Sequence, residues 1–214
     1  MNPPDPGAVL ALWAGGLGLG VAVVSFWKVA RPAFIRLAAG LAAALGLGAA
    51  LLGSGTFAWV GVGLALSSAI ARVGAPLVVA AAFWMVAGAS AVGWPSALIG
   101  AASLGGISSE MLLGHWFLVD PKLPRWPLRR LAYFGVAGIA AEGVRVVLLP
   151  NEGLIATPLV LALLAALTLV LMIGVVFSLR VRSYTGVMAA TGLSYLATIT
   201  ALAVAIISRP QPIG

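Results

Sequence analysis

The chain has 214 residues, of which 62% are hydrophobic and 8% are charged, and its mean hydropathy is +1.15. A soluble globular domain carries roughly 25% charged residues, so this composition excludes a soluble protein and indicates a lipid bilayer as the surroundings. The net charge of +7 falls in short clusters between apolar runs, a pattern that indicates membrane topology and not nucleic-acid binding.

Prolines, glycines and polar residues divide the chain into eight apolar runs. In chain order the predicted membrane-spanning helices cover residues 8–30, 33–53, 57–73, 77–93, 96–119, 128–149, 154–179 and 186–208. A helix needs about 20 residues, with roughly 17 to 25 tolerated, to cross a bilayer core of ~30 Å, and the third and fourth runs only just reach that length. The predicted fold is an all-α, polytopic helical bundle forming one transmembrane domain over residues 1–214. The first run is expected to be retained, because no basic segment precedes it as in a signal peptide.

The positions of Lys and Arg support eight crossings. The connections after the first, third, fifth and seventh runs carry ten of them: Lys28, Arg31, Arg36, Arg72, Lys122, Arg125, Arg129, Arg130, Arg180 and Arg182. The connections after the second, fourth and sixth runs carry none, and Arg209 lies in the tail. By the positive-inside rule we expect a multi-pass protein of the plasma membrane (a cell inner membrane) with both termini outside.

Two segments resemble each other. Residues 31–38 (RPAFIRLA) and 125–132 (RWPLRRLA) both open an even-numbered run, with arginines five apart followed by Leu-Ala. A shift of 94 residues places the last four runs on the first four, which suggests a four-plus-four duplication. The alternative is that basic loops before apolar helices resemble one another through composition alone.

Small residues are expected to hold the helices together, because lipid tails are as apolar as leucine and give no hydrophobic drive to association. The chain has 27 glycines, and several recur at helical spacing: Gly16 with Gly20, Gly106 with Gly114, and Gly135 with Gly138. We interpret these as packing faces. Trp13 and Trp84 lie deep within their runs and are expected to pack there.

Three charged residues fall inside predicted spans, where charge is costly and a function is the default hypothesis: Glu110, Glu142 and Arg145. Glu142 and Arg145 are three residues apart, which permits an ion pair on one helix face. If Glu110 lies level with Gly138 in an antiparallel neighbour, Glu142 lies about 6 Å further out at 1.5 Å per residue. The two carboxylates would then share a proton-handling pocket with Arg145 at its rim.

Ser108 and His115 are candidates for the same pocket, from another face of the fifth run. Each candidate also has a structural interpretation: Glu142 with Arg145 as a locking pair, Glu110 bonded to a serine, and His115 as an interfacial residue. Lys122, Arg125, Arg129 and Arg130 are mainly topology determinants, and they are also candidates for docking lipid or a partner protein.

No catalytic or metal-binding constellation emerges from the sequence. Cysteine is absent and His115 is the single histidine, so thiolate sites and bis-histidine haem ligation by this chain alone are excluded. We expect an integral membrane subunit or anchor of a redox or energy-converting complex, with a quinone as the candidate cofactor and other subunits as partners. The alternatives are a small proton-coupled transporter and, with least support, an intramembrane enzyme acting on lipid or an assembly factor.

Overall fold

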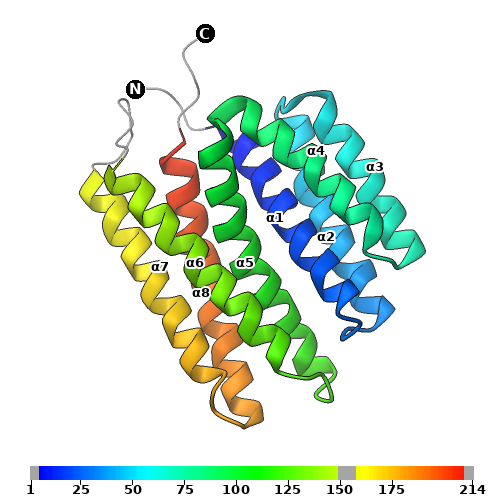
Figure 1. Cartoon of the computed structure of the whole chain (residues 1–214), viewed down its shortest axis with the longest axis vertical. Helices are drawn as coiled ribbons and strands as arrows, with labels where there is room; N and C mark the ends of the chain where they lie inside the picture. Colours follow the sequence, from blue (N-terminus) through cyan, green and yellow to red (C-terminus); the bar gives the residue numbers. More distant parts are fainter. Residues whose placement is uncertain (1–4, 149–157, 210–214) are drawn as a thin grey trace.

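The computed structural model describes residues 5–148 and 158–209, which form eight α-helices and no strands (Figure 1). The helices are α1 (Pro6–Phe26), α2 (Pro32–Leu51), α3 (Gly55–Ala71), α4 (Ala75–Val92), α5 (Trp94–Val119), α6 (Trp126–Leu148), α7 (Pro158–Ser178) and α8 (Tyr184–Ile207). Seven of these helices are long and apolar enough to cross a membrane, and α3 is shorter, with 17 residues. The expected all-α membrane bundle is confirmed.

Most helices begin about two residues before the predicted start, and several of them have a proline in the first turn. Pro32, Pro95 and Pro127 each occupy the first or second position of a helix. Proline lacks an N–H, but the first N–H groups of a helix have no intrahelical acceptor, so proline fits there without losing a bond. The predicted stop between the sixth and seventh runs, at residues 150–153, lies outside the described residues.

The helices form two groups of four that lie side by side (Figure 1). In the first half, α1 to α4 pack in a ring, each on the next, and α4 closes on α1. In the second half, α5 to α8 form a ring in the same way. The halves meet mainly where α1 packs along α5. This grouping agrees with a four-plus-four architecture, while a duplication of the sequence stays a prediction.

Glycines let α1 and α5 approach closely at the contact between the halves. A Cβ atom on Gly16 would overlap the backbone of Ala101, and one on Gly105 would overlap the backbone of Gly16. One turn along, Gly20 lies against the side chain of Ser109. Close backbone approach is the main source of helix association in lipid. The expected packing role of Gly16 and Gly20 is confirmed.

Trp84 fills the centre of the first half. Its side chain, on α4, is fully buried, and its indole N–H donates to the carbonyl oxygen of Ala58 on α3 at 3.2 Å. The ring fits because Gly46 on α2 and Gly61 on α3 leave space for it; a Cβ atom on either would overlap the indole. The expected packing role of Trp84 is confirmed.

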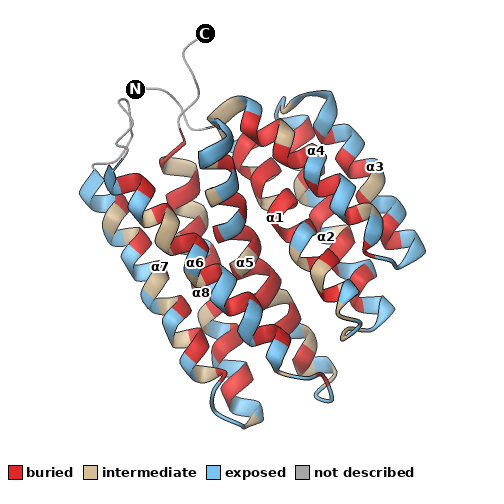
Figure 2. Ribbon diagram, in the orientation of Figure 1, coloured by how far each residue is buried: buried red, intermediate tan, exposed pale blue. Residues whose placement is uncertain are grey.

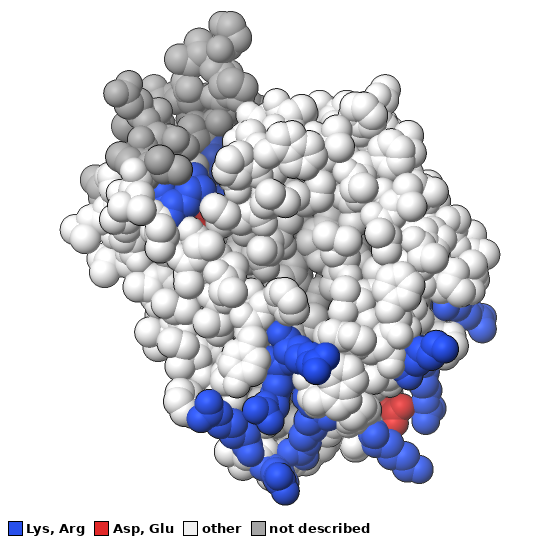
Figure 3. All heavy atoms as spheres, viewed as in Figure 1, with Lys and Arg blue, Asp and Glu red and all other residues white. Residues whose placement is uncertain are grey.

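The surface separates into an apolar belt and one basic end. Large apolar side chains along the helices are exposed (Figure 2), such as Leu163, Val170 and Ile199. Lys and Arg gather at the end of the bundle away from the termini, where α1, α3, α5 and α7 finish (Figure 3). At this basic end Arg31 pairs with Asp120 at 2.9 Å and joins the two halves. An apolar belt with one charged end is the surface expected of a multi-pass membrane protein.

Candidate functional site: two buried carboxylates and an apolar groove

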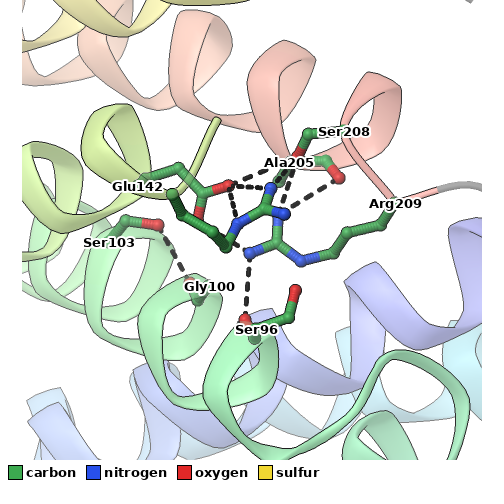
Figure 4. Close-up of polar contacts among 8 residues, drawn as sticks. Ser96, Gly100, Ser103, Glu142, Ala205, Ser208 and Arg209 are labelled. Atoms are coloured by element: carbon green, nitrogen blue, oxygen red, sulfur yellow. Dashed lines mark hydrogen bonds and ion pairs between the residues drawn. The ribbon is translucent and has the colours of Figure 1, made fainter. Parts of the chain in front are cut away.

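The first polar centre lies in the second half, at the end where the termini lie, around Glu142 on α6 (Figure 4). Arg145 donates from Nη2 and Nε to Glu142 Oε1, at 2.7 and 3.2 Å. Arg209, just beyond α8, donates from Nη2 to Glu142 Oε2 at 2.7 Å. Ser208 Oγ accepts from Arg145 Nη2 at 2.6 Å. The predicted pair of Glu142 with Arg145 is confirmed, and a second arginine completes a triad.

Arg209 also ties the triad to the rest of the fold. Its Nη2 donates to the carbonyl oxygen of Ser96 in the first turn of α5 at 3.0 Å, and its own carbonyl accepts from the N–H of Asp5, which caps α1. Arg209 follows the end of α8, in the tail where the sequence places it, but its side chain is only 2% exposed and packs inside the bundle. A buried guanidinium needs a carboxylate partner, and Glu142 on another helix provides one.

This triad suits a fixed structural role better than proton transfer. Both carboxylate oxygens of Glu142 accept from guanidinium groups, which stabilise the charged form. Two guanidinium groups share one carboxylate, and all three side chains are buried. Removal of the carboxylate would leave two cations without a counter-charge in the described part of the cluster. The triad also holds three helices together, because Glu142 and Arg145 lie on α6, Arg209 follows α8, and Arg209 bonds to the first turn of α5.

The second polar centre is Glu110, which is fully buried where α5 packs against α8. Its Oε2 accepts a short hydrogen bond from Ser194 Oγ, and its Oε1 has no hydrogen-bond partner among the described residues. Thr191 lies beside it, near Gly114. Glu110 is therefore bonded to a serine, as its structural interpretation expected, with one oxygen left for a further donor.

The structure separates the two carboxylates, contrary to the shared pocket expected from the sequence. A Cβ atom on Gly138 would meet the backbone of Ser103 at 2.5 Å, so these residues are level in the antiparallel pair of α5 and α6. Glu142 therefore lies opposite Ile99, and Glu110 is eleven residues further, about 16 Å along the helix at 1.5 Å per residue. The expectation that Gly138 is level with Glu110 is wrong, because the small-residue contacts set a different register.

Ser108 and His115 lie apart from both carboxylates. Ser108 Oγ donates to the carbonyl oxygen of Leu104 at 2.5 Å and accepts the indole N–H of Trp13 at 3.1 Å, so it joins α5 to α1. His115 is exposed on α5. Within the described ranges, no hydrogen bond joins either residue to Glu110 or Glu142, so the structure does not bring the five predicted pocket residues together.

The predicted docking residues lie at the basic end and differ in their contacts. Arg125 donates to the carbonyl oxygen of Val181 at 3.0 Å, which joins the loop after α5 to the loop after α7. Arg130 stacks over the ring of Trp126 at 4.8 Å. Lys122 and Arg129 are exposed. The set therefore includes side chains that brace the loops as well as side chains that face outward.

A groove of about 360 Å³ runs between α1, α5 and α6. Apart from Ser109 and the indole of Trp94, its lining is apolar or glycine, and includes Gly16, Gly20, Leu98, Gly105, Gly106, Leu131 and Phe134. Ser109 is 2% exposed, and its hydroxyl has no hydrogen-bond partner among the described residues. The groove thus combines an apolar surface with a buried serine hydroxyl, packed against Gly20, that has no partner in the described structure.

Sequence reasoning missed the polar face of α8. Thr191, Ser194 and Thr198 recur at intervals of three and four residues, and all three are buried. Thr198 Oγ1 lies 3.6 Å from the sulfur of Met111 on α5. The spacing puts the three hydroxyls on one helix face, so it was a usable signal that α8 would face a polar group. Each of these hydroxyls also lies within hydrogen-bond distance of the carbonyl four residues earlier. The single hydrogen of the Ser194 hydroxyl can go to that carbonyl or to Glu110, but not to both at once.

The described residues offer no metal site: nowhere in residues 5–148 and 158–209 do three His, Cys, Asp or Glu side chains gather as ligands would. In comparisons with known proteins, no family model, curated protein or solved structure matches the chain. Inference about function therefore depends on the two carboxylates, the groove and the distribution of charge.

Proposed function

We propose that this chain is a membrane subunit of a redox or energy-converting complex, which binds a quinone in the α1–α5–α6 groove and handles a proton at Glu110. The observation that carries the proposal is the position of Ser109 next to Glu110. Ser109 lines an apolar groove, and each of these neighbouring residues has a buried oxygen with no hydrogen-bond partner in the described structure. A quinone needs an apolar surface, a hydrogen bond to a carbonyl and a route for protons.

The depth of Ser109 favours a quinone over a phospholipid. Ser109 lies ten residues before the end of α5, about 15 Å into a bilayer core of ~30 Å. Phospholipid ester groups lie at the interface. A ligand whose carbonyl group bonds to Ser109 at this depth would therefore be a molecule that dissolves in the bilayer core. Quinones are molecules of this kind, and Ser109 Oγ can donate to one of the two carbonyl oxygens once its side chain turns from Gly20 toward the groove.

Glu110 is the group suited to proton handling. Reduction of a quinone to a quinol takes up two electrons and two protons. This chain provides no cysteine for an iron–sulfur cluster, so the electrons would come from the redox group of a partner subunit. Unlike Glu142, Glu110 forms no ion pair in the described structure and keeps one oxygen without a partner, so it can gain or lose a proton without breaking a salt bridge.

The basic end is the surface proposed to dock a partner subunit, and it is also proposed to face the cytoplasm. All ten cationic residues of the odd-numbered connections lie there, and Asp120 is the acidic residue that accompanies them in the described structure. An acidic soluble subunit would find complementary charge at this end. The positive-inside rule then puts the termini on the outer side of the plasma membrane.

The test is the quinone content of the protein purified in mild detergent, measured by solvent extraction and mass spectrometry. We expect quinone to accompany the wild type and to fall about 2- to 12-fold in Ser109→Ala, the effect of one neutral hydrogen bond. Ser103→Ala is the matched control, because Ser103 is equally buried on α5 but bonds to the carbonyl of Gly100. If wild-type protein from quinone-containing membranes carries none, the quinone proposal fails.

A small proton-coupled transporter is the second candidate, and the two-half architecture favours it. The halves meet mainly at α1 and α5, and rocking of one half against the other is a common transport mechanism. In that case Glu110→Gln abolishes proton-driven uptake in proteoliposomes. Co-purification with a soluble redox subunit would favour the first function and count against this one.

A further inference from the structure

A cleft of about 400 Å³ lies at the basic end, away from the groove and from both carboxylates. It is lined by residues of α2 and α5 and by the residue that caps α3: Ala33, Arg36, Leu37, Arg72 and Trp116. Two arginines from different helices therefore face one concave surface. The sequence indicated only that these arginines set topology, which leaves the cleft without an assigned role.

The two arginines of the cleft have no partner in the described structure, unlike several other arginines of the basic end. Arg31 is paired with Asp120, and Arg125 and Arg180 stack over aromatic rings. In residues 5–148 and 158–209, neither Arg36 nor Arg72 takes part in an ion pair, a ring contact or a side-chain hydrogen bond, and both are exposed. Their guanidinium groups are therefore free to bind an anion.

Trp116 adds a neutral donor to the cleft. Its ring packs edge-on against Phe34, with centroids 5.8 Å apart, and this contact fixes α5 against α2. The indole nitrogen is buried, and no acceptor for it lies within the described residues. A buried N–H without a partner is unfavourable by about 1–3 kcal/mol. An acceptor oxygen in the cleft would remove this penalty once a small shift of the ring uncovers the nitrogen.

The depth of the cleft matches the lipid headgroup region. Trp116 lies three residues before the end of α5, Arg36 four residues after the start of α2, and Arg72 at the end of α3. All three therefore lie within about one helical turn of a helix end at the basic end of the bundle, and tryptophan and arginine at the ends of membrane-spanning helices meet lipid headgroups. The ligand of this cleft is therefore expected at the level of the phosphate groups.

We propose that this cleft binds the phosphate group of an anionic phospholipid of the leaflet at the basic end. Arg36 and Arg72 hold the phosphate oxygens through charge-assisted hydrogen bonds, and the Trp116 indole N–H donates a third. Leu37 is 52% exposed beside them and provides an apolar surface for the first part of an acyl chain. This apolar wall favours a lipid over free phosphate. The proposal is independent of the quinone and of Glu110.

The test uses native mass spectrometry of the full-length protein in detergent with added phosphatidylglycerol or phosphatidylcholine. Wild type is expected to retain one phosphatidylglycerol and no phosphatidylcholine. The double variant Arg36→Gln/Arg72→Gln is expected to bind it about 25-fold more weakly, at roughly fivefold per arginine. The matched control, Lys28→Gln/Arg182→Gln, removes the same charge from exposed positions of the same end and is expected to retain the lipid.

Trp116→Phe distinguishes lipid binding in the cleft from electrostatic attraction of anionic lipid to the whole basic end, because it removes one hydrogen bond and no charge. We expect it to weaken retention about 2- to 12-fold. Equal loss of lipid in the two double variants would overturn the proposal, since surface charge alone would then explain binding. The last measurement compares how inorganic phosphate and phosphatidylglycerol shift the unfolding midpoint of the wild type. If inorganic phosphate raises the midpoint as much as phosphatidylglycerol does, free phosphate is the ligand and the lipid assignment is wrong.

Discussion

Replacing Glu142 by glutamine should strongly destabilise the protein, because the carboxylate is the counter-charge of two buried arginines. Arg145 and Arg209 are 7% and 2% exposed, so neither can turn into water without unfolding its surroundings. Removing one partner of a buried ion pair costs about 3–5 kcal/mol. At about 2–4 °C per kcal/mol for a chain of this size, the unfolding midpoint should fall by about 6–20 °C.

The assay is thermal unfolding of the purified protein in detergent, followed by tryptophan fluorescence. Asp120→Asn is the matched control, since it also removes one carboxylate from an ion pair with arginine. Its partner Arg31 is 70% exposed, and exposed pairs contribute about 0–1 kcal/mol. A midpoint for Glu142→Gln no lower than that of Asp120→Asn would refute a structural role for the triad.

Three further substitutions test the packing and the second carboxylate. Gly138→Ala should lower the unfolding midpoint, because its Cβ atom would meet the backbone of α5 at 2.5 Å, whereas Gly40→Ala, with nothing within 4 Å, should leave it equal or higher. Trp84→Ala should destabilise by about 3–5 kcal/mol, the effect of emptying a tightly packed site; a loss below about 1 kcal/mol would mean that the first half does not depend on this ring. Glu110→Gln should keep the wild-type midpoint within about 2 °C, because the amide oxygen still accepts from Ser194 and no cation loses its partner; a loss as large as that of Glu142→Gln would show a structural charge at Glu110.

The eight helices and their basic end could be predicted from the sequence because both depend on local properties. Apolar runs of about 20 residues leave few options for the backbone in lipid, and the position of each arginine follows from the number of crossings before it. Glu142 with Arg145 was predictable for the same reason, since helical spacing alone brings them together.

Contacts between helices were not predictable from spacing. The register of α5 against α6 depends on which small residues meet, and glycines are frequent enough on both helices to permit several registers. The true contact of Gly138 with Ser103 moves Glu142 away from Glu110. Arg209 gave no sign of its partner, because it lies 67 residues from Glu142 along the chain and no helical spacing relates the two.

Single-cysteine labelling in intact cells is the most direct measurement of the membrane arrangement. The chain has no cysteine, so one introduced thiol gives an unambiguous signal. Thr56→Cys and Thr185→Cys are exposed positions at opposite ends of the bundle, and neither changes the charge. We predict that a membrane-impermeant maleimide labels Thr56→Cys and labels Thr185→Cys only after the membrane is permeabilised. Labelling of Thr185→Cys in intact cells would contradict an eight-crossing bundle with its basic end in the cytoplasm.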